Sequence, residues 1–144
     1  MSEQDATLQG SPSPQARGPV LLAEDDDAMR AMIASALRRD GYEVIEAANG
    51  LQLWELLETY VGDGPVRTPA LVISDIRMPG ASGLEVLAAL RAHNPTTPVV
   101  LTTAFGDAET HAEGDRLGAQ LVLDKPFDLA DLRTVVRVLM GAGG

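Results

Sequence analysis

Several short apolar segments of this sequence end in polar residues of the kinds that carry phosphoryl chemistry. The acids Glu24–Asp27 follow the apolar segment Val20–Ala23, and Asp75, Thr103 and Lys125 end or follow three later apolar segments. Carboxylates are ligands that Mg²⁺ prefers, and a carboxylate can also attack a phosphorus atom. A hydroxyl and an ammonium group can hold phosphate oxygens. Together these residue types indicate a site for metal-assisted phosphoryl transfer.

Each of these residues also has an ordinary structural explanation. Carboxylates favour the first turn of a helix, which accounts for one or two of the acids in Glu24–Asp27. Asp75 could end a strand in a turn, Thr103 could be an ordinary β-branched strand residue, and Lys125 could be a solvated loop lysine. Their combination favours a site in which Asp25 and Asp75 supply carboxylates to Mg²⁺. Asp75 is then the nucleophile, and Thr103 and Lys125 hold the remaining phosphoryl oxygens.

The apolar pattern predicts five strands that alternate with five helices. Short, continuously apolar strands are typical of a parallel sheet that is covered by helices on both faces. The strands are expected at residues 20–23, 43–47, 70–75, 98–103 and 120–124. The first helix is expected to bury Met29, Ile33, Ala36 and Leu37 and to stop at Gly41, and the later ones are expected near 49–60, 82–94, 108–117 and 128–139.

Local signals mark further details of these elements. Ser82 and Glu85 are expected to form a capping box, and Asp128 is expected to cap the last helix. That helix is expected to point Leu132, Val135 and Leu139 inward. A loop is expected at residues 62–69, and His93 and His111 are expected to be surface histidines.

Four motifs give the chain a family resemblance. They are Leu22–Asp26, Ser74–Gly80, Leu101–Ala104 and Asp124–Phe127. In this order and spacing they resemble the receiver-domain family of response regulators in two-component signalling, from about residue 19 to residue 140. The resemblance implies an α/β fold, which is a flavodoxin-like, doubly wound sheet of five parallel strands in the order 2-1-3-4-5 with helices on both faces.

The resemblance also assigns roles to individual residues. Asp75 falls on the phosphoacceptor, Thr103 on the signalling hydroxyl and Lys125 on the phosphate-binding lysine. The implied cofactor is Mg²⁺, and its ligands fall on Glu24, Asp25, Asp75 and the backbone carbonyl of Arg77.

One position departs from the family pattern. Where the family often has a tyrosine or phenylalanine in strand five, this chain has Val122, and Phe105 is the aromatic residue nearest in sequence to Thr103. The expected switch residues are therefore Thr103, Phe105 and Val122. Val122 cannot swing a ring inward, so Phe105 is expected to be the moving part.

The resemblance and the composition set the expected function. We expect a stand-alone receiver that takes its phosphoryl group from a sensor histidine kinase or a histidine phosphotransfer protein. It should catalyse only its own phosphorylation and slow dephosphorylation, and signal to a downstream protein target through its fourth helix, fifth strand and fifth helix. A phosphorylation-dependent dimer remains open.

The charge and the chain ends complete these expectations. The formal net charge is -10, which disfavours direct DNA binding. The sequence lacks cysteine, a signal peptide and a membrane span, so a cytoplasmic protein is expected. Residues 1–18 are expected to be a disordered tail, residues 19–140 the receiver, and residues 141–144 a flexible tail.

Three alternative functions also agree with parts of this pattern. A phosphohydrolase of the haloacid-dehalogenase type also places an aspartate nucleophile after a strand, but it needs a second aspartate where this chain has Arg77. A flavin-binding module needs aromatic loops, which Trp54 and Phe105 do not supply. A receiver that signals without phosphorylation is disfavoured only because every key residue is present.

Overall fold

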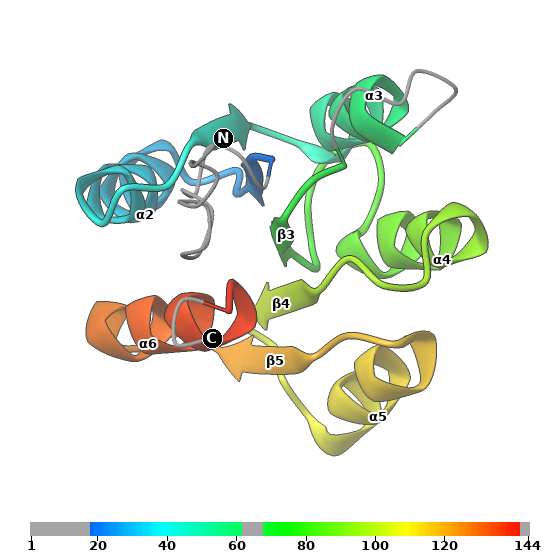
Figure 1. Cartoon of the computed structure of the whole chain (residues 1–144). Coiled ribbons are helices and arrows are strands. Elements are labelled where there is room, and N and C mark those ends of the chain that lie inside the picture. Colours follow the sequence, from blue (N-terminus) through cyan, green and yellow to red (C-terminus); the bar gives the residue numbers. More distant parts are fainter. Residues whose placement is uncertain (1–17, 62–67, 142–144) are drawn as a thin grey trace.

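The computed structural model describes residues 18–61 and 68–141, which form a five-stranded parallel sheet in the order β2-β1-β3-β4-β5 (Figure 1). This order confirms the predicted fold class. The strands are β1 (Val20–Ala23), β2 (Val44–Ala47), β3 (Leu71–Asp75), β4 (Val99–Thr103) and β5 (Leu121–Asp124). The helices are α2 (Asp27–Arg39), α3 (Gly50–Val61), α4 (Gly83–His93), α5 (Ala108–Leu117) and α6 (Leu129–Leu139).

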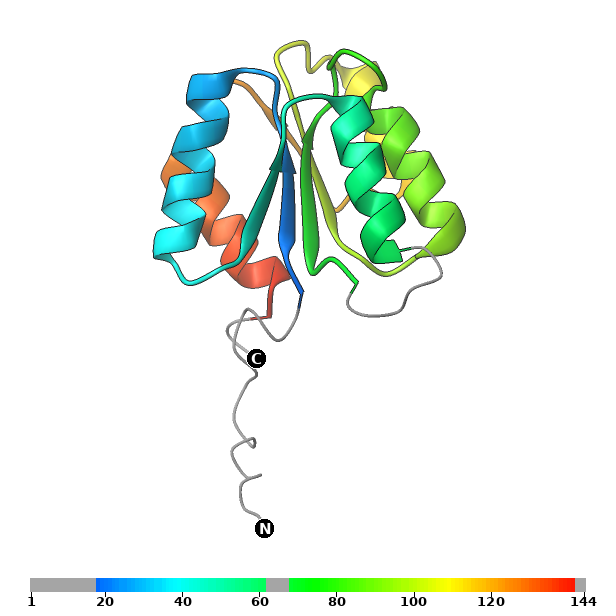
Figure 2. The same cartoon turned by 90° about the horizontal axis from the view of Figure 1, so that it is seen from above.

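Helices cover both faces of the sheet and bury its central strands. Helices α2 and α6 lie on one face, and α3, α4 and α5 lie on the other (Figures 1 and 2). One apolar cluster includes Ile33 and Leu132, and the other includes Leu53 and Leu101. Because β1, β3 and β4 are buried along their whole length, the carboxyl ends of these strands are held rigidly at one edge of the sheet.

The helix ends follow the capping signals of the sequence. Asn49 Oδ1 accepts a hydrogen bond from the backbone of Gln52, and Ser82 forms the predicted capping box with Glu85. Asp128 caps α6, as predicted. Gly41 follows α2 with φ 99° and Gly118 ends α5 with φ 99°, a backbone conformation that favours glycine.

Helix α6 differs from the prediction in one detail. Leu132 and Val136 are its fully buried residues, whereas Val135 and Leu139 pack at the edge of the same cluster. The predicted inward face has Val135 in place of Val136, and this part of the prediction is wrong. Both are one helical turn from Leu132, so the sequence pattern alone does not separate them.

Helix α5 has fewer buried residues than any of the other helices. Its one buried residue is Gly114, where an added Cβ would lie 2.7 Å from Cγ2 of Val122. The glycine therefore lets α5 lie close to β5, but it contributes no side chain to the core. A helix with so few buried apolar contacts is expected to have low local stability.

Several predictions fall on residues outside the described part. They concern the tails at 1–17 and 142–144 and the loop at 62–67. In the described ranges 18–61 and 68–141, no helix is long and apolar enough to cross a membrane.

Candidate functional site

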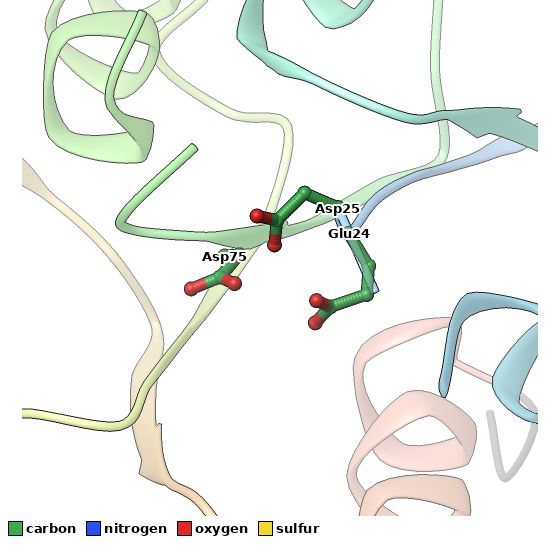
Figure 3. Close-up of side chains that lie close together, drawn as sticks. All are labelled: Glu24, Asp25 and Asp75. Atoms are coloured by element: carbon green, nitrogen blue, oxygen red, sulfur yellow. The ribbon is translucent and has the colours of Figure 1, made fainter. Parts of the chain in front are cut away.

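Three carboxylates meet where β1 and β3 end. The two strands are neighbours in register, with Ala23 opposite Ser74, so Glu24 and Asp25 follow β1 beside Asp75 at the end of β3. Ligand oxygens of the three residues lie within 4.8 Å of one another. Figure 3 shows the three side chains converging on one space. Glu24 and Asp75 are buried, with 2% and 5% exposure, while Asp25 is open to solvent.

Lys125 completes this cluster from the other side of β4. Its Nζ donates hydrogen bonds of 2.8 Å to Oε1 of Glu24 and 2.8 Å to Oδ2 of Asp75. Burial raises the pKa of Glu24 above its usual value, and this outweighs the hydrogen bond from Lys125. Burial alone would lower the pKa of Lys125, but the two carboxylates outweigh it and raise the pKa above its ordinary value. Lys125 is therefore held as a cation.

Thr103 lies at the end of β4, which is the strand between β3 and β5. Thr103 is 1% exposed, and its Oγ1 accepts a hydrogen bond of 3.0 Å from the backbone N–H of Phe105. Its neighbour Thr102 is opposite Asp75 in the sheet register. The strand ends thus bring Thr103 to the same edge of the sheet as Asp75 and Lys125.

Arg77 and Phe105 lie on the loops that leave this edge. The backbone N–H of Arg77 donates to Oδ1 of Asp75 at 3.3 Å, and its guanidinium carbon lies 4.5 Å from the centre of the Phe105 ring. Phe105 is 60% exposed. Val122, the third expected switch residue, is buried in β5 against Gly114. The structure therefore separates Val122 from the strand-end cluster.

Two contacts near the site have no signal in the sequence. One is the stacking of Arg77 on Phe105. The other is a 2.9 Å contact between Nε2 of His111 and Oδ1 of Asp124. His111 was expected to be a surface histidine, but it is only partly exposed and ties α5 to the end of β5. Both contacts join residues of different loops or elements, and no periodic signal marks such pairs in a sequence.

The donor set fits a hard divalent cation. Three carboxylates face one ammonium group, so Glu24, Asp25 and Asp75 retain an excess of negative charge when Lys125 is counted. Mg²⁺ is commonly bound by one or two carboxylates together with water and phosphate oxygens. Solvent-exposed Asp25 leaves one side of the cluster open to such further ligands.

Comparison with known proteins gives the family. The profile of the response regulator receiver domain matches residues 20–137. Regulatory protein AtoC of Escherichia coli (strain K12) is 36% identical over 118 residues, which cover 82% of this chain and 24% of AtoC. Sporulation initiation phosphotransferase F of Bacillus subtilis (strain 168) is 29% identical over 118 residues, which cover 82% of this chain and 90% of that protein.

A solved structure agrees with this result. Response regulator protein TrrA from Thermotoga maritima, solved in complex with Mg²⁺-BeF, matches with a TM-score of 0.71 and 28% identity. The match covers 85% of this chain and 98% of that one. The chain belongs to the response regulator receiver domain family. Receiver domains are signalling domains rather than metabolic enzymes, and they accept phosphoryl groups from histidine kinases. The family match decides against the phosphohydrolase and flavin-binding alternatives.

Proposed function

We propose that this receiver accepts its phosphoryl group on Asp75, in a reaction that depends on Mg²⁺. The observation that carries the proposal is the meeting of Asp75 with Glu24, Asp25 and Lys125 at the carboxyl edge of the sheet. Buried Asp75 is fixed by the ammonium of Lys125 on Oδ2 and by the N–H of Arg77 near Oδ1. Its position is therefore set before a phosphodonor arrives.

The transfer step uses the residues as follows. An oxygen of Asp75 forms a bond to phosphorus while the bond from phosphorus to the donor's leaving atom breaks, and the electron pair stays with the leaving group. Lys125 then holds one phosphoryl oxygen, and the hydroxyl of Thr103 turns from the N–H of Phe105 to another. Glu24, Asp25 and Asp75, with the carbonyl of Arg77, would hold Mg²⁺. When bound, the cation would neutralise negative charge between Asp75 and the incoming group.

We also infer that the protein works as a separate receiver that signals to proteins. Support comes from phosphotransferase F, of which the matched segment makes up 90%. The net charge of -10 opposes binding to a phosphate backbone. By family resemblance the phosphodonor is a histidine kinase or phosphotransfer protein, and the output surface comprises α5, β5 and α6. Because AtoC is covered over only 24% of its length, the size of the endogenous protein on an immunoblot is the direct test of the separate receiver.

A phosphate-affinity gel tests the phosphoacceptor. With Mg²⁺ and acetyl phosphate the protein should give one retarded band, which EDTA or the substitution Asp75→Asn abolishes. Asp124→Asn is a matched control, since Asp124 lies beside Lys125 but outside the carboxylate cluster, and it should keep the band. A retarded band that survives Asp75→Asn would overturn the assignment. No band for the folded wild-type protein with any phosphodonor would favour a receiver that signals without phosphorylation.

A further inference from the structure

The guanidinium of Arg77 stacks on the ring of Phe105, and the contact bridges two loops. Arg77 follows β3 and Phe105 follows β4, and the contact measures 4.5 Å. Among the described residues no carboxylate forms a direct ion pair with Arg77, although Asp107 attracts it at longer range. The Phe105 ring is therefore the side chain that the guanidinium contacts. Phe105 is 60% exposed, which makes this a cation–π contact in a largely hydrated setting.

The contact lies beside the place that the proposed chemistry uses. A pocket of about 430 Å³ opens between the two loops, and Arg77, Thr103 and Phe105 all contribute to its walls. Thr103 is the residue whose hydroxyl is proposed to turn to the phosphoryl group. The backbone N–H of Arg77 is already 3.3 Å from Oδ1 of Asp75, so its flexible side chain starts next to the phosphoacceptor.

A phosphoryl group on Asp75 would compete with the ring for this guanidinium. A guanidinium group matches phosphate geometry with two parallel hydrogen bonds, and such charge-assisted bonds are about twice as strong as neutral ones. An exposed cation–π contact is weak by comparison. The guanidinium would therefore favour the phosphoryl group over Phe105.

We propose that Arg77 is a second phosphoryl-binding cation of this site, and that its transfer from Phe105 to the phosphoryl group releases the ring as the switching event. This inference rests on the proposed phosphorylation of Asp75. It adds that Arg77 binds the phosphoryl group and so responds to phosphorylation. The strand-five position, where the family often has an aromatic ring, holds Val122 in this chain. Phe105 would then be the aromatic residue that moves.

The released ring is well placed to alter α5. The N–H of Phe105 donates to Oγ1 of Thr103, so both proposed movements loosen the same short segment before α5. At Gly106 an added Cβ would collide with Oδ1 of Asp124, the oxygen that contacts His111 of α5. Movement of the segment at Gly106 would therefore disturb the contact between His111 and Asp124, which joins α5 to β5. Gly114 is the only fully buried residue of α5 and Leu117 packs at the edge of the core, so little core packing opposes the shift.

Competition between the ring and the phosphoryl group predicts a specific pattern of affinities. The probe is beryllofluoride, a phosphoryl mimic, titrated calorimetrically into the whole protein in excess Mg²⁺. Arg77→Met should weaken its binding about tenfold or more, because a charged hydrogen-bond donor is lost. Phe105→Leu should strengthen binding by about two- to fivefold, because the competing partner of Arg77 is removed. In the Arg77→Met background, Phe105→Leu should have no effect.

Arg116→Met is the matched control. It removes the same charge from an exposed arginine of α5 that pairs with Glu113, and it should leave the affinity within about twofold. A Phe105→Leu variant that binds more weakly or equally, or whose gain persists in the Arg77→Met background, would overturn the exchange while leaving phosphorylation of Asp75 intact. Failure of the wild type to bind beryllofluoride, together with no phosphorylation of Asp75, would overturn the proposed function itself.

The ring can also be followed directly. The chain has two phenylalanines, so fluorophenylalanine gives two ¹⁹F signals, and Phe105→Leu identifies the one from position 105. Beryllofluoride should move this signal in the wild type towards the position that it has in Mg²⁺-loaded Arg77→Met without the mimic. A signal that stays in place while the mimic binds would contradict release of the ring.

Discussion

The ammonium nitrogen of Lys125 lies 2.8 Å from Oδ2 of Asp75, although 50 residues separate the two in the chain. The same nitrogen lies 2.8 Å from Oε1 of Glu24, so one cation bridges the ends of β1 and β3 from the end of β5. This contact crosses β4, and it depends on the strand order of the whole sheet. It fixes an oxygen of Asp75 and places a positive charge where a phosphoryl group would need one.

Lys125 is the only lysine of the chain, so its reactivity reports on this bridge. Its pKa is raised above the ordinary value of 10.5, so less neutral amine is present at any pH below that value than in an unpaired lysine. In the folded, metal-free protein at pH 8 to 9, an amine-reactive reagent should label Lys125 several-fold more slowly than it labels Lys125 in protein unfolded by urea. Asp75→Asn should speed labelling of the folded protein. Equal rates for the variant and the wild type, measured by mass spectrometry, would contradict the bridge.

The metal should depend on Asp25 far more than on Asp27. Asp25 belongs to the carboxylate cluster, whereas Asp27 lies in the first turn of α2 and pairs with Arg30 at 2.8 Å. Asp25→Ala should weaken Mg²⁺ binding by about tenfold or more, because Mg²⁺ relies on few protein carboxylates. Asp27→Ala should change it by about twofold or less. Calorimetric titration decides between them, and equal losses would mean that the cation lies elsewhere.

Thr103 and Val122 should affect different properties. Thr103→Ala removes the hydroxyl that is proposed to turn to the phosphoryl group, so hydrogen exchange of α5 should respond little to beryllofluoride. Val122→Ala removes two buried methyl groups beside Gly114 and should lower the free energy of unfolding by about 2 kcal/mol. Its exchange response should persist. A lost response in Val122→Ala combined with an intact one in Thr103→Ala would contradict the route through the β4–α5 segment.

The phosphorylated protein should lose its phosphoryl group slowly. Arg77 and Phe105 line the pocket beside the site, and neither side chain can act as a base toward water. The double change Arg77→Asn with Phe105→Glu introduces an amide and a carboxylate at these positions. It should speed dephosphorylation by about tenfold or more. The decay of the retarded band after removal of the donor measures the rate, and an unchanged or slower decay would count against this explanation.

The sequence predicts the order of elements well because strong local signals mark them. Gly41 and Gly118 stop helices, Ser82 and Asp128 begin them, and the apolar runs give strands whose ends differ from the predicted ones by at most one residue. The strand order came from the family resemblance, since local patterns do not specify which strands pair.

Site contacts across loops could not be predicted in the same way. The acids and Lys125 were expected at one edge of the sheet because all parallel strands end there. The stacking of Arg77 on Phe105 and the pairing of His111 with Asp124 depend instead on loop paths and side-chain rotamers. No periodic pattern in the sequence marks either pair, so these contacts are seen only in the three-dimensional structure.

The most direct test of the central claim is to locate the phosphoryl group. Borohydride reduces an aspartyl phosphate to homoserine, and the altered residue can be placed by mass spectrometry of the peptides. After treatment with a phosphodonor and Mg²⁺, homoserine should appear at position 75 and should be absent when EDTA is added. Homoserine at another aspartate, or a phosphorylated Asp75→Asn variant, would contradict the assignment of Asp75 as the phosphoacceptor.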